Sequence, residues 1–258
     1  MIADVFSIFV AVIIYITIVF AVAIAKKRLD IVDIAWGGAF IVAALTSFML
    51  AENPGTLQVL VTGLVIIWGG RLGYTILRRV MRSPEEDPRY TELRAQWKGS
   101  LAFNAYVRIF LVQGFLATVV SASVITINLS DFHSISTVSI VGLVIWVIGF
   151  LFESIGDAQL KKHLTDPAKK GQLMTSGLWK YTRHPNYFGE AIQWWGIWII
   201  ALAVPFGWIG VMSPLLITVL LLFVSGVPLT EKRFAGRAGW NEYRKRTSVF
   251  IPLPPKKP

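Results

Sequence analysis

The chain of 258 residues contains no cysteine, only three histidines, and few charged side chains, which make up 16% of it. Without cysteine there is no disulfide, no thiolate nucleophile and no cysteine-based zinc or iron–sulfur site. Three scattered histidines make a poor metal cluster, so we expect no metal site. The scarcity of charge argues against a soluble globular enzyme, because such domains carry about 25% charged residues.

Apolar side chains dominate instead, at 55% of the chain with 10 Trp and 16 Phe. A single soluble core cannot bury so much apolar surface. A transmembrane helix needs about 20 apolar residues. We therefore predict an all-α polytopic membrane bundle of about seven transmembrane helices, forming a single domain over 1–258. Hydropathy places the predicted spans at 3–25, 31–51, 57–77, 101–127, 137–160, 186–205 and 207–229.

The chain is strongly basic, with 25 Lys and Arg against 15 Asp and Glu and a formal net charge of +10. In a soluble protein this charge would suggest a nucleic-acid partner. The basic residues lie at one end of the predicted spans, however, and the connections 52–56, 128–134 and 204–208 contain none. By the positive-inside rule, the N-terminus lies outside and the C-terminus in the cytoplasm. We expect an integral protein of the bacterial inner membrane that does not bind nucleic acid.

Among the charged residues inside the predicted spans, five lie in the parts nearer the cytoplasm and are the candidates for a polar site. A charge within the membrane is costly and usually faces the bundle interior or a wet cavity. This pattern predicts a polar site that opens to the cytoplasm, although each residue alone could reach the membrane surface or pair with a neighbouring helix. Gly69 and Gly73 form a G-x-x-x-G face that favours close helix packing over phosphate binding. The five charged residues are Asp33, Arg71, Glu153, Asp157 and Glu190.

The segment 177–198 is the densest in polar and aromatic side chains. Pro185 suits the first turn of a helix, whose N-terminus beside Arg183 would provide donors and positive potential for an anion. Glu190, Trp194 and Trp198 follow at four-residue spacing, so they could line a cavity with one acid and two aromatic walls. For the tryptophans alone, a position at the membrane interface or against lipid is the alternative.

Residues 183–190, R-H-P-N-Y-F-G-E, resemble the C-terminal signature R-H-P-N-Y-x-G-[DE] of the steroid 5α-reductase superfamily, which includes the sterol reductases. The resemblance extends over most of the chain to a bacterial branch of 3-oxo-5α-steroid 4-dehydrogenase-like membrane proteins. The other segments that carry it are D-I-A-W-G at 33–37, W-G-G-R-L-G-Y at 68–74, E-D-P-R-Y at 86–90, Glu153 with Asp157 and Gln159, and Y-R-K-R-T at 243–247.

This resemblance implies a seven-helix membrane enzyme that takes NADPH from the cytoplasmic side. The enzyme would transfer a hydride to a polarised C=C bond of a lipid-like substrate. It also implies that the tail, 230–258, folds over the cofactor, whereas by itself this tail could be a solvated basic segment at the membrane surface. The positions that match cofactor-pocket residues are Arg71, Asp157, Tyr181, Arg183, Asn186 and Glu190, with Tyr243 and Arg246 in the tail.

The sequence departs from the steroid enzymes at the catalytic end. Those enzymes carry a Gln-Glu pair in the second helix and a tyrosine in the third. Here the acid of the second span is Asp33, and the tyrosine position falls on Trp68. Because an indole cannot deliver a proton as a phenol does, we expect Asp33 or Tyr74 to be the catalytic proton donor. We also expect little turnover of Δ4-3-ketosteroids.

Two other functions remain open. The isoprenylcysteine methyltransferases share a similar R-H-P-x-Y-x-G signature and a cytoplasmic tail, which would make the chain an S-adenosylmethionine-dependent methyltransferase. Asn186 and Glu190 favour the reductase. A non-catalytic lipid-binding or assembly protein could also retain the scaffold. Binding of NADPH, of S-adenosylmethionine, or of neither distinguishes the three.

Overall fold

The computed structural model describes residues 2–256. Within this part of the chain every regular element is a helix, and the only extended pairing is an isolated parallel bridge between Thr182 and Ser248. The predicted all-α membrane bundle is therefore confirmed. The chain divides into two compact units, and the expectation of a single domain over 1–258 stays a prediction.

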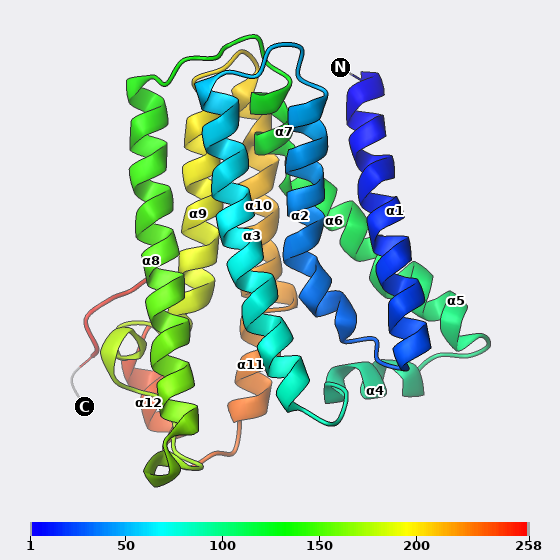
Figure 1. The fold of residues 1–258 in the computed structure, drawn as a ribbon. Coiled ribbons are helices and arrows are strands. Elements are labelled where there is room, and N and C mark those ends of the chain that lie inside the picture. Colours follow the sequence, from blue (N-terminus) through cyan, green and yellow to red (C-terminus); the bar gives the residue numbers. More distant parts are fainter. Residues whose placement is uncertain (1, 257–258) are drawn as a thin grey trace. The chain divides into compact units, whose positions relative to one another are not determined.

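The first unit comprises Met1–Ser136 with Ala201–Met212. Its long helices α1, α2 and α3 pack in that order, and the short helix α4 lies across the lower ends of α2 and α3 (Figure 1). The helical elements are α1 (Ile2–Lys26), α2 (Ile31–Met49), α3 (Thr56–Arg82), α4 (Pro88–Ala95), α5 (Leu101–Ala105), the π-helical η1 (Tyr106–Leu111), α6 (Val112–Val120), α7 (Ala122–Asn128) and the 3-10 turn η4 (Gly207–Val211).

Helices α2 and α3 approach each other closely through small residues. A Cβ atom on Gly69 would lie 2.6 Å from the carbonyl oxygen of Gly37, and one on Gly73 would lie 3.3 Å from that of Ile34. In lipid, where apolar side chains gain little by leaving the solvent, such close backbone contact is a main source of helix association. The prediction that Gly69 and Gly73 serve helix packing is confirmed.

The second unit comprises Thr137–Ile200 with Ser213–Pro258. Its longest helix, α8, is followed by two short 3-10 turns that lead into α9 (Figure 1). The helical elements are α8 (Thr137–Thr165), η2 (Pro167–Lys169), η3 (Gly177–Lys180), α9 (Pro185–Ala201), α10 (Met212–Val219), the π-helical η5 (Leu220–Val224), α11 (Val227–Phe234) and α12 (Trp240–Arg246).

Glycines also set the contact between α8 and α9, which run antiparallel. A Cβ on Gly142 would lie 2.6 Å from the carbonyl oxygen of Gly196, and one on Gly149 would lie 2.7 Å from that of Gly189. Gly156, a further seven residues along α8, lies against the first turn of α9. A repeat of seven residues returns to the same helix face, so these glycines form one continuous contact line.

Within residues 2–256, six helical segments are long and apolar enough to cross a membrane, and they correspond to all the predicted spans except 186–205. There the structure has α9, whose 17 residues extend about 26 Å, slightly less than the hydrocarbon core of about 30 Å. The fourth predicted span, 101–127, bends at Ser121, whose hydroxyl donates to the carbonyl oxygen of Ala117 at 2.8 Å. The orientation of the bundle in the membrane stays a prediction.

Candidate functional site

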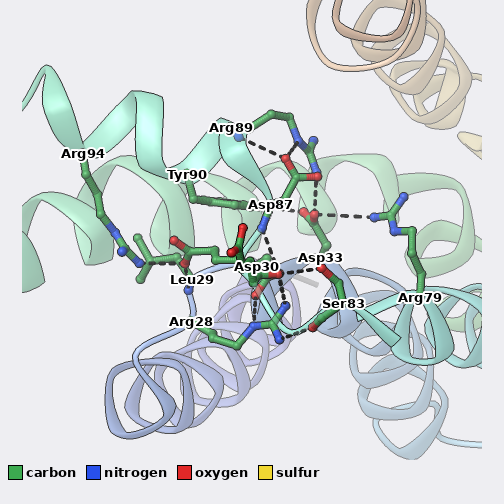
Figure 2. A network of polar contacts seen from close by, with 12 residues as sticks. Arg28, Leu29, Asp30, Asp33, Arg79, Ser83, Asp87, Arg89, Tyr90 and Arg94 are labelled. Carbon is green, nitrogen blue, oxygen red and sulfur yellow. Dashed lines mark hydrogen bonds and ion pairs between the residues drawn. The ribbon is translucent and has the colours of Figure 1, made fainter. Parts of the chain in front are cut away.

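In the first unit, the loops that precede α2 and α4 are joined by a group of ion pairs and hydrogen bonds, here called the loop network (Figure 2). The carboxylate of Asp33 accepts hydrogen bonds from Arg89 Nη2 and from the hydroxyl of Tyr90, each at 2.7 Å. Arg79 Nη2 approaches the same carboxylate at 3.9 Å. Two of the segments that carry the family resemblance, 33–37 and 86–90, therefore contact each other.

Arg28 is the second connection in the loop network. Its Nη2 pairs with Asp30 Oδ2 at 2.7 Å and donates to the carbonyl oxygen of Glu85 at 3.0 Å, while its Nη1 donates to that of Ser83 at 2.9 Å. Asp30 also accepts a hydrogen bond from the backbone N–H of Asp87 at 3.2 Å. The loop after α3 is thereby held against the loop before α2.

Glu86 completes the network, because its carboxylate accepts from Arg94 at 2.6 Å and from the backbone N–H of Leu29. Burial, followed by the Asp33 carboxylate, raises the pKa of Tyr90 well above its usual value. Burial alone would lower the pKa of Arg89, but nearby carboxylates raise it. A cavity of about 160 Å³ is lined by Asp30, Asp33, Arg79, Val80, Ser83, Glu85, Glu86, Asp87 and Pro88.

The two predicted proton donors have different surroundings. Asp33 accepts hydrogen bonds and holds α4 in place, so its geometry is that of an acceptor. Tyr74 is 59% exposed, and its hydroxyl accepts a hydrogen bond from Arg78 Nη1 at 3.3 Å. Arg71 lies two residues from Gly69 and from Gly73, about 200° around α3, and so on the side away from α2. The three predicted site residues of the first unit therefore have different surroundings.

In the second unit, Arg183 ties the start of α9 to the tail. Its side chain is 8% exposed, and Nε and Nη2 donate to Glu231 Oε1 at 2.8 and 2.7 Å. Its Nη1 donates to the carbonyl oxygens of Arg244 at 3.0 Å and Thr247 at 2.5 Å. These contacts use most of the five guanidinium N–H groups. Arg183 is thus an internal anchor, and little of its donor capacity is left for the anion that the sequence suggested.

The tail after α11 folds back onto residues 177–183. The backbone N–H of Arg183 donates to Ser248 at 2.8 Å, and that of Leu253 donates to Tyr181 at 3.0 Å. The hydroxyl of Tyr243 donates to the carbonyl oxygen of Trp179 in η3 at 2.6 Å. The tail is therefore a folded part of the second unit, and its position over a cofactor stays a prediction.

His184 and Glu231 lie at the centre of this anchor. His184 is 1% exposed, with Nε2 3.4 Å from Glu231 Oε1 and its ring stacked on Tyr187 at 5.2 Å between centroids. Burial lowers the pKa of His184, and Glu231 only partly opposes this effect. Burial raises the pKa of Tyr243. At neutral pH the imidazole of His184 and the phenol of Tyr243 are therefore uncharged.

Acceptor oxygens are concentrated where α8 and α9 meet. Asn186, in the first turn of α9, has a buried Oδ1 without a hydrogen-bond partner among the described residues. Glu190, one turn further along α9, is 8% exposed. Glu153, on α8, is 2% exposed and accepts from Gln193 Nε2 at 2.6 Å. Asp157 lies one turn beyond Glu153 and follows the glycine at which α8 approaches Asn186. Buried polar atoms are rarely left unpaired, so the Asn186 oxygen indicates a place for a ligand or water.

The remaining predicted residues of this unit lie at the surface. Tyr181 is 42% exposed, and the ammonium group of Lys180 lies 5.9 Å from its ring centre. Arg246, the last residue of α12, is exposed, and its carbonyl oxygen accepts from the backbone N–H of Lys256 at 2.9 Å. The second unit thus places Asn186 and Glu190 one turn apart on α9, Asp157 next to the glycine at which α8 contacts α9, and Arg183 with Tyr243 at the tail.

Two features of this unit are missing from the sequence interpretation. Glu231 lies in a basic, amphipathic stretch after the last predicted span, and nothing in its neighbourhood identifies it as the partner of Arg183. The seven-residue spacing of Gly142, Gly149 and Gly156 is, in contrast, visible in the sequence and predicts a close helix contact on one face.

These features define a helical membrane protein in which a folded tail is anchored to a buried, acceptor-rich segment at the start of α9. A family model described as "Protein of unknown function (DUF1295)" matches residues 19–247. Because the match covers most of the chain, the chain belongs to the DUF1295 family. No curated protein and no solved structure is significantly similar to it.

Proposed function

We propose that the chain is an integral membrane, NADPH-dependent reductase of a polarised C=C bond in a lipid-like substrate. The proposal depends on the resemblance of residues 183–190 to the steroid 5α-reductase superfamily. The structural observation that supports it is the buried carboxamide oxygen of Asn186, which lacks a partner among the described residues. This atom lies one turn from the buried Glu190, so a ligand there meets two acceptors in a low-dielectric environment.

The residues present fit the cofactor by donor and acceptor type. Asn186, Glu190 and Asp157 would accept hydrogen bonds from the carboxamide and hydroxyl donors of NADPH. The phosphates would pair with exposed basic side chains of α12 such as Arg246, because Arg183 is used by Glu231 and the tail. When bound, NADPH supplies a hydride to the substrate. The tail is hydrogen-bonded to residues 179–183, directly before α9. If it also covered the bound cofactor, it would exclude water and strengthen each charge interaction there.

The reduction also needs a proton, since hydride addition to a polarised C=C bond leaves negative charge on the substrate. Asp33 already accepts hydrogen bonds from Arg89 and Tyr90, and a carboxylate in that position is a poor proton donor. Tyr74 carries a phenolic proton and an accessible hydroxyl. Within this proposal we therefore favour Tyr74 over Asp33 as the donor.

A second candidate function is methyl transfer from S-adenosylmethionine. Its sulfonium and ammonium groups are cationic, and they suit a cluster in which Glu153 and Glu190 are buried while Arg183 is neutralised by Glu231. This arrangement favours a positively charged ligand as well as a neutral donor. The two functions differ in the ligand that the second unit binds.

The test is an equilibrium titration of the detergent-purified protein with NADPH and, separately, with S-adenosylmethionine. Asn186→Ala should weaken NADPH binding about tenfold, because one buried hydrogen bond is worth about 1–1.5 kcal/mol. Asn53→Ala, an exposed residue of the α2–α3 loop, is the matched control and should leave the affinity unchanged. Equal NADPH affinity of all three proteins would refute the assigned site. Binding of S-adenosylmethionine alone would select the methyltransferase, and binding of neither would select the non-catalytic protein.

A further inference from the structure

The loop network separates the charges of the first unit into an inner and an outer set. The inner acidic side chains are only 3–16% exposed, and each is paired with an arginine that is 22–30% exposed. The acids are Asp30, Asp33, Glu86 and Asp87, and the arginines are Arg28, Arg89 and Arg94. Most acidic side chains at this end of the unit are thus already paired with arginines inside the loop network.

A second set of basic side chains lies outside the network and is exposed. We call these residues the outer basic surface: Lys26, Lys27, Arg78, Arg79 and Arg82. Arg79 is 62% exposed and reaches Asp33 only at 3.9 Å. For the other four, no acidic side chain of the described residues 2–256 lies within ion-pair distance.

The five cations belong to one surface because the network joins the helices that carry them. Arg28, which follows Lys27 directly, donates to the carbonyl oxygen of Ser83, which follows Arg82 directly. The ends of α1 and α3 are therefore adjacent (Figure 2). In the adjoining segment 78–98 the exposed acids are Glu85 and Glu92, so positive charge is in excess.

Apolar side chains extend outward beside these cations. On α3, Met81 is 77% exposed and Leu77 is 38% exposed, next to Arg78 and Arg82. Because α3 is long and apolar enough to span a membrane, this is where the helix leaves the hydrocarbon region. Apolar side chains at that depth contact acyl chains, while the guanidinium groups reach the lipid headgroups.

We propose that the outer basic surface binds the headgroup of an anionic phospholipid in the leaflet on the predicted cytoplasmic side. A guanidinium group matches phosphate oxygens with two parallel hydrogen bonds, and its charge does not depend on pH in the physiological range. In a zwitterionic headgroup, the positively charged group repels the basic surface and so offsets part of the attraction to the phosphate. The partner is therefore a lipid of net negative charge, and phosphatidylglycerol is the probe of choice.

The experiment measures lipid retention by native mass spectrometry after purification in mixed micelles with phosphatidylglycerol or phosphatidylcholine. The variant is Arg78→Gln with Arg82→Gln. The control is Lys161→Gln with Lys162→Gln, two exposed cations near the end of α8, another segment able to span the membrane. Wild type and control should retain phosphatidylglycerol, and the arginine variant should retain about 25-fold less, since each of the two basic residues near an anionic surface contributes about fivefold.

Three lipid-retention results would each overturn the proposal: equal retention by both double variants and wild type, equal loss in both double variants, or equal retention of phosphatidylcholine and phosphatidylglycerol by wild type. An arm with inorganic phosphate distinguishes the lipid from a free anion. If phosphate alone displaces the lipid at millimolar concentration, the surface is a phosphate site and the lipid assignment fails. NADPH is absent from every arm, so the outcome is independent of the proposed reductase.

Discussion

The strongest test of the second unit is to remove the charge of Glu231 and measure whether the tail detaches. Glu231 is the acidic partner of the buried Arg183, which in turn holds two carbonyl oxygens of the tail. Glu231→Gln keeps the size of the side chain but replaces charge-assisted hydrogen bonds by neutral ones. Such a replacement costs about 1.5–3 kcal/mol, which increases the detached population about 10- to 100-fold.

The absence of native cysteine makes a single reporter thiol possible. Thr247 is 6% exposed and lies where the tail meets Arg183, so Thr247→Cys places a protected thiol at the contact. The rate of maleimide labelling then reports the fraction of time that the tail is detached. In the Glu231→Gln background the labelling rate should rise by at least tenfold at neutral pH.

The matched control removes the same charge from the same segment. Glu242 lies on α12, is exposed, and makes no ion pair within residues 2–256, so Glu242→Gln should leave the labelling rate unchanged. If Glu231→Gln and Glu242→Gln label at the same rate, the anchor does not hold the tail. The measurement needs no cofactor and no substrate, so it is independent of the proposed activity.

Gly189→Ala should lower the thermal unfolding midpoint, because its Cβ would lie 2.8 Å from a Cβ on α8 and overpacking costs about 1–3 kcal/mol. The control is Gly70→Ala, which should leave the midpoint unchanged because no atom lies within 4 Å of the added Cβ. The pKa of His184 is lower in the folded chain than its usual value of about 6.5, so the unfolded chain binds the proton more readily. Stability should therefore fall as the pH drops below about 6.5, and His184→Gln should reduce this fall in denaturation curves at pH 7.5 and 5.5. Asp33→Asn should lower the unfolding midpoint through the loss of its two charge-assisted hydrogen bonds, and an unchanged midpoint would contradict its structural role. Tyr74→Phe should keep the midpoint and decrease NADPH oxidation at least tenfold, and full activity would exclude this tyrosine as the proton donor.

Much of the fold follows from hydropathy and residue size. Spans such as 3–25 and 31–51 are continuous apolar runs, and their positions agree with α1 and α2 within a few residues. The predicted span 186–205 extends four residues beyond the end of α9 at Ala201. The backbone turn itself falls inside the predicted connection 204–208, where Phe206 has a left-handed φ of 59°.

The sequence predicted which residues lie near the candidate site better than it predicted what each side chain does there. Asn186 and Glu190 lie one helical turn apart on α9, with the Oδ1 atom of Asn186 and the side chain of Glu190 buried. Arg183 was interpreted as an anion donor because its sequence neighbours form a helix start. Its partner Glu231 is 48 residues away, and that pairing depends on tertiary packing. Asp33 was interpreted from its depth in a span, which cannot show that Arg89 returns to it from the next loop.

The glycine contacts between α8 and α9 have a mechanical consequence. The two helices contact closely at three successive glycines of α8, namely Gly142, Gly149 and Gly156. No side chains lie between the helices there that could change rotamer, so sliding or separation of the helices would break many contacts at once. The helices α8 and α9 should therefore move together as a rigid body. If a ligand binds at the first turn of α9, the movement that admits it must therefore occur outside this pair of helices.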